Sequence, residues 1–472
     1  MEGHIAIFPS PGIGHLIPFT ELAHRLLLHR RLFITFIIPT AAGTTLKPQN
    51  DILNAMPETI SSIFLPPVNI NDLPNDVALA TRISLTVTRS LPALRQTLND
   101  LTSSQSVKKS PSALVVDLFG PPSFEIAKDF NIPPYLFSTV SAMTLVSIFH
   151  TPILDQMYAC EYIDLPEPVR LPGCVPIPGA DIAEPLNDKK NEAYSRVVEI
   201  AKLYSLAKGV LVNSFLELEP GPFKAMEEGE WCKPEIYSVG PLIRSGSGNQ
   251  TGEGFECLKW LDKHPVGSVL FVSFGSGGTL SQKQLNELAF GLEQSGQKFL
   301  WVVKSPQGKS DASYFYSQTR IEPCEVLPEG FLERVEDRGL VMSYWVPQVE
   351  ILSHVSTGGF LTHCGWNSIL ESVVCGVPMV AWPLYAEQKQ NAVLLTDGLG
   401  VACRVKADGQ GVVGRDEINK CVRSLMEGED GRKMRLKMNE HKGLGVTNII
   451  VVLSFNVSYK FISYVKMQRC PI

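Results

Sequence analysis

Short apolar runs, each followed by a turn and a helical pattern, recur along the whole of this 472-residue chain. In the first half these runs span 4–8, 33–38, 113–117, 135–138 and 209–213. A second series spans 269–273, 298–303, 339–344, 359–362 and 378–381. Strands that alternate with helices form parallel sheets whose two faces are covered by helices. The pattern therefore predicts an α/β protein with two parallel-sheet domains.

A Gly/Ser-rich stretch at 241–255 interrupts the apolar pattern and has the composition of a linker. It separates a predicted N-terminal domain, 1–240, from a predicted C-terminal domain, 256–442. Two domains agree with the chain length, since roughly 150 residues per domain gives two or three. Residues 305–325 have no regular pattern and are predicted to form a surface loop.

Charge and composition exclude several classes of protein. The chain has 42 basic and 48 acidic residues, a formal net charge of −6, and no long basic run, which argues against a nucleic-acid partner. Its start does not resemble a secretory signal, and no apolar run reaches the roughly 18 residues of a membrane span. The ten cysteines form no C-x-x-C pair, which favours a reducing compartment. We expect a cytoplasmic protein, and a monomer.

Two polar residues follow buried strands of the N-terminal domain. His15 lies on a Gly-rich turn after the first strand, in Pro9-Ser-Pro-Gly-Ile-Gly-His15, and Asp117 ends the strand at 113–117. Ligands bind at the carboxyl ends of strands in open α/β sheets. A histidine there suits a general base, and a carboxylate can hold its other ring nitrogen. Taken singly, the two residues fit a turn and a helix cap, but the pair favours a catalytic dyad.

Two motifs in the second half indicate a nucleotide site. Phe274-Gly-Ser276-Gly-Gly-Thr279 connects a strand to a helix and offers amides and a hydroxyl to a phosphate. A sharper pattern runs from Trp345-Val-Pro-Gln348 through Thr362-His-Cys-Gly-Trp-Asn-Ser-Ile-Leu-Glu371 to Glu387-Gln388. Its length, its terminal Trp and Gln, and its central His-Cys-Gly-Trp-Asn-Ser resemble the donor-site signature of the plant family 1 UDP-glycosyltransferases. The resemblance extends over residues 1 to about 442.

This resemblance implies a GT-B fold, in which two Rossmann-like parallel-sheet domains face each other across a cleft. It further implies an inverting, metal-independent O-glucosyltransferase with a His15–Asp117 dyad, an acceptor-binding N-terminal domain and a UDP-sugar-binding C-terminal domain. UDP-glucose would be a co-substrate, and no cofactor or metal is expected. Within the family the chain is most similar to members that glucosylate hydroquinone, so the expected acceptor is a hydroquinone-like or phenylpropanoid phenol.

The resemblance also assigns residues to each part of the donor. The expected contacts are Trp345 and the backbone of Val346 for uracil, Gln348 and Glu371 for ribose, Ser276, His363 and the amides of Asn367 and Ser368 for the diphosphate, and Trp366, Glu387 and Gln388 for the sugar. Each aromatic residue alone is more simply explained as part of the core, and the joint spacing is what favours a donor site. Four apolar residues are acceptor candidates, with plain core positions as the alternative: Ile83, Phe119, Phe149 and Leu186.

After residue 442 the chain departs from the family. Residues 443–472 are apolar and β-branched without helical periodicity, whereas the resemblance implies a polar helix that crosses back to the N-terminal domain. We expect a non-homologous tail, or a divergent end that packs as a strand or irregular segment. This leaves an alternative function, a catalytically impaired isoform that binds nucleotide. A sugar-nucleotide epimerase is a weaker alternative.

Overall fold

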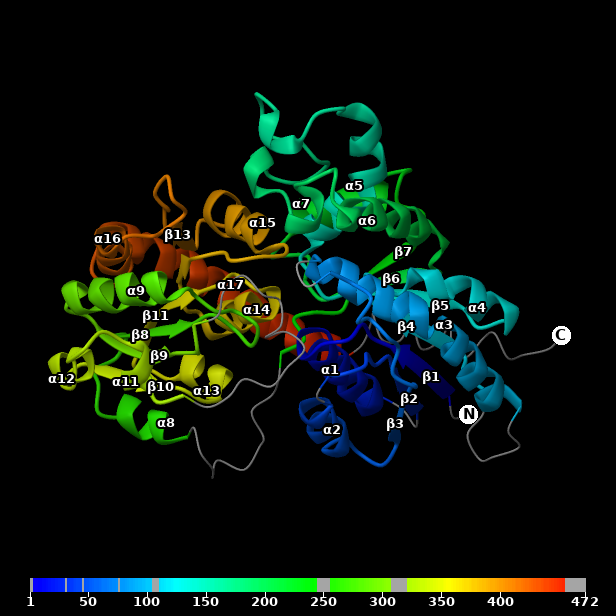
Figure 1. The fold of residues 1–472 in the computed structure, drawn as a ribbon, viewed down its shortest axis with the longest axis horizontal. Helices are drawn as coiled ribbons and strands as arrows, with labels where there is room; N and C mark the ends of the chain where they lie inside the picture. Colours follow the sequence, from blue (N-terminus) through cyan, green and yellow to red (C-terminus); the bar gives the residue numbers. More distant parts are fainter. Residues whose placement is uncertain are drawn as a thin grey trace. The chain divides into compact units, whose positions relative to one another are not determined.

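The computed structural model describes residues 3–29, 32–44, 46–74, 77–103, 110–243, 255–306 and 321–454. Contacts within the chain define two compact units. The first contains Met1–Ile243 together with the described residues from Thr447 onward, and the second contains Arg244–Val446. In each unit helices flank a central sheet (Figure 1). Residues 244–254, most of the predicted linker, lie outside the described residues.

The first unit is built on a seven-stranded parallel sheet with the order β3-β2-β1-β4-β5-β6-β7. Its strands are β1 (Gly3–Phe8), β2 (Leu32–Ile38), β3 (Ile60–Phe64), β4 (Ala113–Val116), β5 (Pro134–Ser138), β6 (Gly209–Val212) and β7 (Glu235–Ser238). The neighbours β1 and β4 are almost wholly buried and end side by side, with Phe8 opposite Val116. The residues that follow β1 and the residues that follow β4 are therefore close together, at the carboxyl edge of the sheet.

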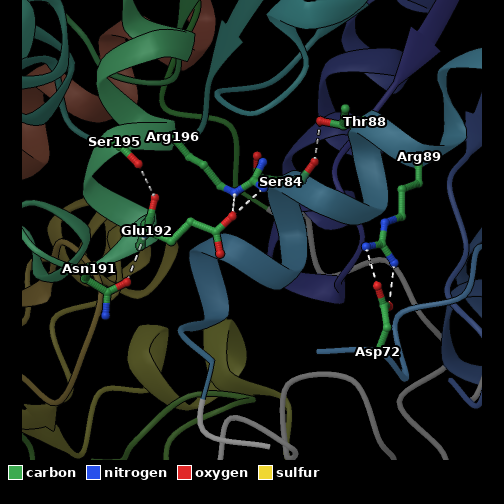
Figure 2. A network of polar contacts seen from close by, with 9 residues as sticks. Asp72, Ser84, Thr88, Arg89, Asn191, Glu192, Ser195 and Arg196 are labelled. Atoms are coloured by element: carbon green, nitrogen blue, oxygen red, sulfur yellow. Dashed lines mark hydrogen bonds and ion pairs between the residues drawn. The ribbon is translucent and has the colours of Figure 1, made fainter. Parts of the chain in front are cut away.

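Among the described residues up to Ile243, α-helices and 3-10 turns flank this sheet. They are α1 (Ile13–His29), α2 (Lys47–Asn54), α3 (Leu79–Ser103), α4 (Phe124–Asp129), α5 (Ala142–Met157), α6 (Glu192–Leu203) and α7 (Pro220–Glu228), with 3-10 turns η1 (Pro121–Ser123), η2 (Tyr162–Asp164), η3 (Gly179–Asp181), η4 (Glu184–Leu186) and η5 (Tyr204–Leu206). Figure 2 shows polar contacts on α3 and α6: Arg89 forms two 2.7 Å bonds with Asp72, and Arg196 pairs with Glu192 one turn away. These pairs are exposed, so their contribution to stability is small.

The second unit is built on a six-stranded parallel sheet with the order β10-β9-β8-β11-β12-β13. Its strands are β8 (Val269–Ser273), β9 (Lys298–Val302), β10 (Gly339–Met342), β11 (Thr357–Thr362), β12 (Met379–Ala381) and β13 (Ala402–Arg404). Its helices are α8 (Glu256–Leu261), α9 (Gln282–Ser295), α11 (Pro323–Val326), α12 (Phe331–Arg334), α13 (Gln348–Ser353), α14 (Trp366–Cys375), α15 (Gln388–Val393), the π-helical turn η6 (Leu394–Gly398), α16 (Arg415–Met426) and α17 (Glu429–Ser454), which runs on past Val446. Fully buried Phe299 and Trp301 lie in its core.

The predicted α/β class with two parallel sheets is confirmed. A strand of the structure corresponds to each of the ten predicted apolar runs, and three further strands, β3, β7 and β13, were not predicted. Of the predicted loop at 305–325, residues 307–320 lie outside the described residues, and the end of the loop forms α11. In the part of the chain that the structure describes, no helix combines the length and apolarity needed to span a bilayer.

The expectation that the start of the tail forms a strand or an irregular segment is wrong, because α17 continues without a break to Ser454. Residues before 443 already form a helix, and extending an existing helix is far easier than nucleating one. The β-branched residues that follow lower helix stability by only a few tenths of a kcal/mol each, roughly, so they do not stop it. The remainder of the predicted tail, 455–472, lies outside the described residues.

Candidate active site

The turn after β1 and the end of β4 bring His15 and Asp117 together in the first unit. His15 lies in the first turn of α1, which the chain enters through Gly12, a residue with φ of 114° that only glycine adopts readily. Its Nδ1 lies 2.8 Å from Oδ2 of Asp117. Since Nδ1 faces a carboxylate, the favoured neutral tautomer has the proton on Nδ1 and the lone pair on Nε2. This is the arrangement of a base held by a buried acid.

Asp117 is fully buried and depends on several donors. Ser10 donates its N–H to Oδ2 at 2.8 Å and its hydroxyl to Oδ1 at 2.6 Å, and the N–H of Phe119 donates to Oδ1 at 3.2 Å. Burial by itself would raise the pKa of Asp117, but the charge and hydrogen bond of His15 and the two bonds from Ser10 hold the pKa below its ordinary value. The carboxyl group is therefore ionised at neutral pH.

The four acceptor candidates lie in different surroundings. The half-buried Phe119 ring lies edge-on to the His15 ring, 6.2 Å between centroids. Phe149 is buried and packs edge-on against Tyr204 and Trp231. Ile83 in α3 and Leu186 in η4 are likewise buried. The structure thus brings Phe119 beside the dyad, while the other three occupy core positions, the alternative raised by the sequence.

In the second unit, β8 and β11 are neighbours, with Ser273 opposite Thr362, so the turns that follow them meet. His363 lies between two glycines. A Cβ added to Gly275 would come within 2.4 Å of the imidazole, and one added to Gly365 within 2.5 Å. The ring therefore fits only because both neighbours lack a side chain.

His363 is buried, and its Nδ1 has no hydrogen-bond partner among the described residues. Burial, aided by the nearby charge of Lys304, lowers the pKa of His363 to about 3. The imidazole is therefore neutral at physiological pH. Next to it, Gly365 is the N-cap of α14, and the predicted amides of Asn367 and Ser368 lie in the first turn of that helix, where N–H groups attract anions. Ser276 is exposed on the turn after β8.

The predicted nucleoside residues form a connected group. Gln348 at the start of α13 donates from Nε2 to Glu371 at 2.6 Å and to the Ser368 hydroxyl at 2.8 Å. Trp345 is 61% exposed, which is unusual for so large an apolar side chain, and its ring is tilted relative to that of Phe255, with 6.3 Å between the centroids. Val346 beside it is buried. An exposed indole can stack on a nucleobase. The side chains of Gln348 and Glu371 can form hydrogen bonds with the two hydroxyls of a ribose.

The three residues predicted to bind the sugar are less exposed to solvent than Trp345. Trp366 is 2% exposed, as expected of a core aromatic residue. Gln388 is also buried, and its side-chain oxygen accepts from the N–H groups of Leu384 and Tyr385 at 2.8 and 3.0 Å. Gln388 therefore shapes the turn before α15, and only its amide nitrogen could serve a ligand. Glu387 is the N-cap residue of α15.

Two residues that the sequence analysis did not single out belong to these sites. Ser10 holds Asp117, as described, and Lys304 bonds the turn that carries Ser276. Both directly follow the carboxyl ends of buried strands, β1 and β9, and that position was the available signal. Among the described residues, no group of three or more His, Cys, Asp or Glu side chains is arranged to hold a metal ion.

Several known proteins are similar to this chain in sequence and structure. The model of the family "UDP-glucoronosyl and UDP-glucosyl transferase" matches residues 256–438. Hydroquinone glucosyltransferase of Rauvolfia serpentina is 54% identical over 440 residues, 93% of this chain and 92% of that protein. UGT2 of Phytolacca americana, solved with UDP-2fluoro-glucose and pterostilbene, is 46% identical, with a TM-score of 0.88 over 99% of both chains.

A UDP-glucosyltransferase from Polygonum tinctorium capable of glucosylating indoxyl, solved with 3,4-dichloroaniline, is 44% identical, with a TM-score of 0.89 over 100% of this chain and 99% of that one. Two parallel α/β units with a His–Asp pair in one and a nucleotide motif in the other define a glycosyltransferase of the GT-B class. The chain belongs to the plant family 1 UDP-glycosyltransferases. The family, the fold class and the enzyme class predicted from the sequence are confirmed.

Proposed function

We propose that this enzyme transfers glucose from UDP-glucose to the hydroxyl of a small phenol, with inversion at the anomeric carbon and without a metal ion. The observation that carries the proposal is the 2.8 Å contact between His15 and Asp117 at the carboxyl edge of the first sheet. The name of the Rauvolfia relative supports a hydroquinone-like acceptor, and the ligands of the Phytolacca structure support a glucose donor and a phenolic acceptor.

In this mechanism His15 takes the phenolic proton at Nε2, and Asp117 stabilises the imidazolium that forms. The acceptor oxygen forms a bond to the anomeric carbon while the bond from that carbon to the diphosphate oxygen breaks. UDP leaves with the electron pair, and the imidazolium later returns its proton to water. A single displacement of this kind converts an α-linked donor into a β-glucoside.

Negative charge that develops on the leaving diphosphate would meet the first turn of α14, the Ser276 hydroxyl and the neutral His363. Trp345 would stack on uracil, with the backbone of Val346 at the base edge. The ribose would lie at Gln348 and Glu371, and the sugar near Trp366, Glu387 and the Gln388 amide. We assign donor binding to the second unit and acceptor binding to the first, with Phe119 the acceptor residue nearest the base.

We also propose that the enzyme works as a monomer in the cytoplasm. None of the cysteines in the described ranges forms a disulfide, which is usual in a reducing compartment.

The test is to incubate the purified chain with UDP-glucose and a panel of hydroquinone, monolignols and flavonols, with and without EDTA. We expect a β-glucoside, identified by the anomeric coupling constant in its proton NMR spectrum, at a rate that EDTA does not change. An α-linked product would refute the single displacement, and loss of activity restored by magnesium would refute metal independence. UDP binding without any transfer would favour the impaired isoform.

A further inference from the structure

Lys304 connects two neighbouring strand ends of the second sheet. It follows β9, and its ammonium group donates to the carbonyl of Ser276 at 2.7 Å and to the carbonyl of Gly275. Both carbonyls belong to the turn after β8, the strand that pairs with β9. Bonds from a charged donor are stronger than neutral ones, so Lys304 fixes the position of this turn.

In the part of the chain that the structure describes, no carboxylate pairs with this cation. None of the ion pairs among the described residues includes Lys304, whose hydrogen-bond acceptors there are the two carbonyls. Burial lowers the pKa of Lys304 to about 8, with no acidic neighbour to oppose the shift. Charges withdrawn from water are normally paired with an opposite charge. Among the described residues, the half-buried Lys304 has no such anionic partner.

The turn that Lys304 holds is the one that faces His363. Gly275 lies against the imidazole, and Ser276 follows it. Since the imidazole is neutral, it provides no positive charge to an anion, whereas the Lys304 ammonium group close to it does. An anion bound at Ser276, His363 and the first turn of α14 would be close to this ammonium group.

We propose that Lys304 is a diphosphate-binding residue of the donor site, whose ammonium group provides the counter-charge for the donor and holds the Gly275–Ser276 turn. It lies outside the Trp345 to Gln388 motif. The inference rests on the proposed function, because the anion it names is the diphosphate of the sugar nucleotide.

The test compares UDP with uridine, which has no phosphate, by calorimetry and by competition against UDP-glucose. Lys304→Met should weaken UDP binding roughly 10-fold to 100-fold, as expected for a lost charge-assisted bond, and leave uridine binding unchanged. Lys304→Arg should restore UDP affinity to within a few fold. Lys420→Met is the matched control, because Lys420 is an exposed lysine of the same unit on α16 and should behave as wild type.

Equal UDP affinity in Lys304→Met and wild type would overturn the inference. An equal loss of affinity for UDP and for uridine would also overturn it, because it would indicate a collapsed turn.

If Lys304→Met does not fold, a measurement on the wild-type enzyme tests the inference. At about pH 8.5 the ammonium is partly deprotonated, so UDP binding should take up a proton, seen in buffers of different ionisation enthalpy. His363 does not titrate near this pH, so it would not contribute to the proton uptake. If UDP binding takes up no proton, the inference is overturned. A wild type that binds no UDP would refute the proposed function instead.

Discussion

Ser10 holds both carboxylate oxygens of Asp117, through its N–H at 2.8 Å and its hydroxyl at 2.6 Å. The two residues follow β1 and β4, which are adjacent in the sheet. Because Asp117 is fully buried, its charge depends on these donors and on His15 rather than on water. Ser10 therefore orients the proposed base through Asp117.

Ser10→Ala removes the hydroxyl bond and keeps the N–H bond. The variant should lose about 1–3 kcal/mol of stability, the usual cost of leaving a buried charged acceptor short of a donor. We expect kcat to fall by roughly tenfold, since a displaced carboxylate orients the base less well. Thermal unfolding and kcat are the measurements. Ser147→Ala, at a buried serine whose hydroxyl has no partner among the described residues, is the control, and equal behaviour of the two variants would contradict the role of Ser10.

His15→Ala should lower kcat by roughly 10² to 10⁴ and leave UDP affinity unchanged, because a general base acts on the acceptor and not on the nucleotide. Asp117→Asn should also lower kcat, through the wrong tautomer and a less stable imidazolium. His24→Ala, on the same helix and partly exposed, should retain full activity. Full activity of His15→Ala with a phenol of ordinary acidity would refute the proposal that His15 and Asp117 form the catalytic dyad.

Trp345→Ala should weaken UDP binding by about 1–3 kcal/mol, the range for stacking of a base on an aromatic ring. The melting temperature of the ligand-free protein should barely change, because the indole is 61% exposed. Calorimetry and thermal unfolding separate the two effects. Leu436→Ala, at another exposed apolar residue of the second unit, should change neither, and UDP binding that survives in Trp345→Ala would contradict the assignment.

Gly275→Ala and Gly267→Ala form a matched pair, with φ of +70° and +65°. Both substitutions strain the backbone by about 1–2 kcal/mol. Only at Gly275 does the new Cβ meet the His363 ring, whereas nothing lies within 4 Å at Gly267. We therefore expect a larger loss of melting temperature in Gly275→Ala than in Gly267→Ala, and a loss of UDP affinity in Gly275→Ala alone. Equal UDP affinities in Gly275→Ala and Gly267→Ala would show that the position of the His363 ring does not affect UDP binding.

Acid should weaken the first unit through Asp117. The pKa of this carboxyl in the folded protein lies below its ordinary value, so the ionised group stabilises the fold above that ordinary value, near 3.8. The contribution is lost as the pH falls through the folded pKa. The free energy of unfolding should therefore fall more steeply with acid in the wild type than in Asp117→Asn, as measured by urea unfolding from about pH 6 to about pH 3. Parallel slopes would contradict this prediction.

The central strands could be predicted because they are buried on both faces and are nearly continuous apolar runs. The three strands that were missed, β3, β7 and β13, lie at the edges of the two sheets. β3 contains Ser61 and Ser62, and β7 begins with the exposed Glu235, so their apolar signal is weak. The helical start of the tail was missed for a different reason, since periodicity does not register a helix that is simply continued from preceding residues.

For the sites, positions after two neighbouring strands indicated His15 and Asp117 as a pair, and the structure places their side chains 2.8 Å apart. Contacts between turns that are distant in the chain could not be predicted from the sequence. Ser10 and Lys304 were overlooked for this reason. A motif also does not reveal which atom of a side chain is already occupied. Gln388 illustrates this, because its oxygen is bonded to the backbone of its own turn.

The burial of the tryptophans has an optical consequence. The chain has six of these residues, and Trp301, Trp366 and Trp382 are buried whereas Trp345 is open to solvent. Trp231 and Trp260 are half-buried. Buried indoles emit at shorter wavelengths than hydrated ones, so Trp345 contributes to the red edge of the fluorescence spectrum together with these two residues. On the proposed assignment, a base stacked on Trp345 would quench its share of the red emission and leave the blue part of the spectrum in place. The enzyme would then contain its own reporter of nucleotide occupancy, one that needs no attached dye and that is lost in Trp345→Ala.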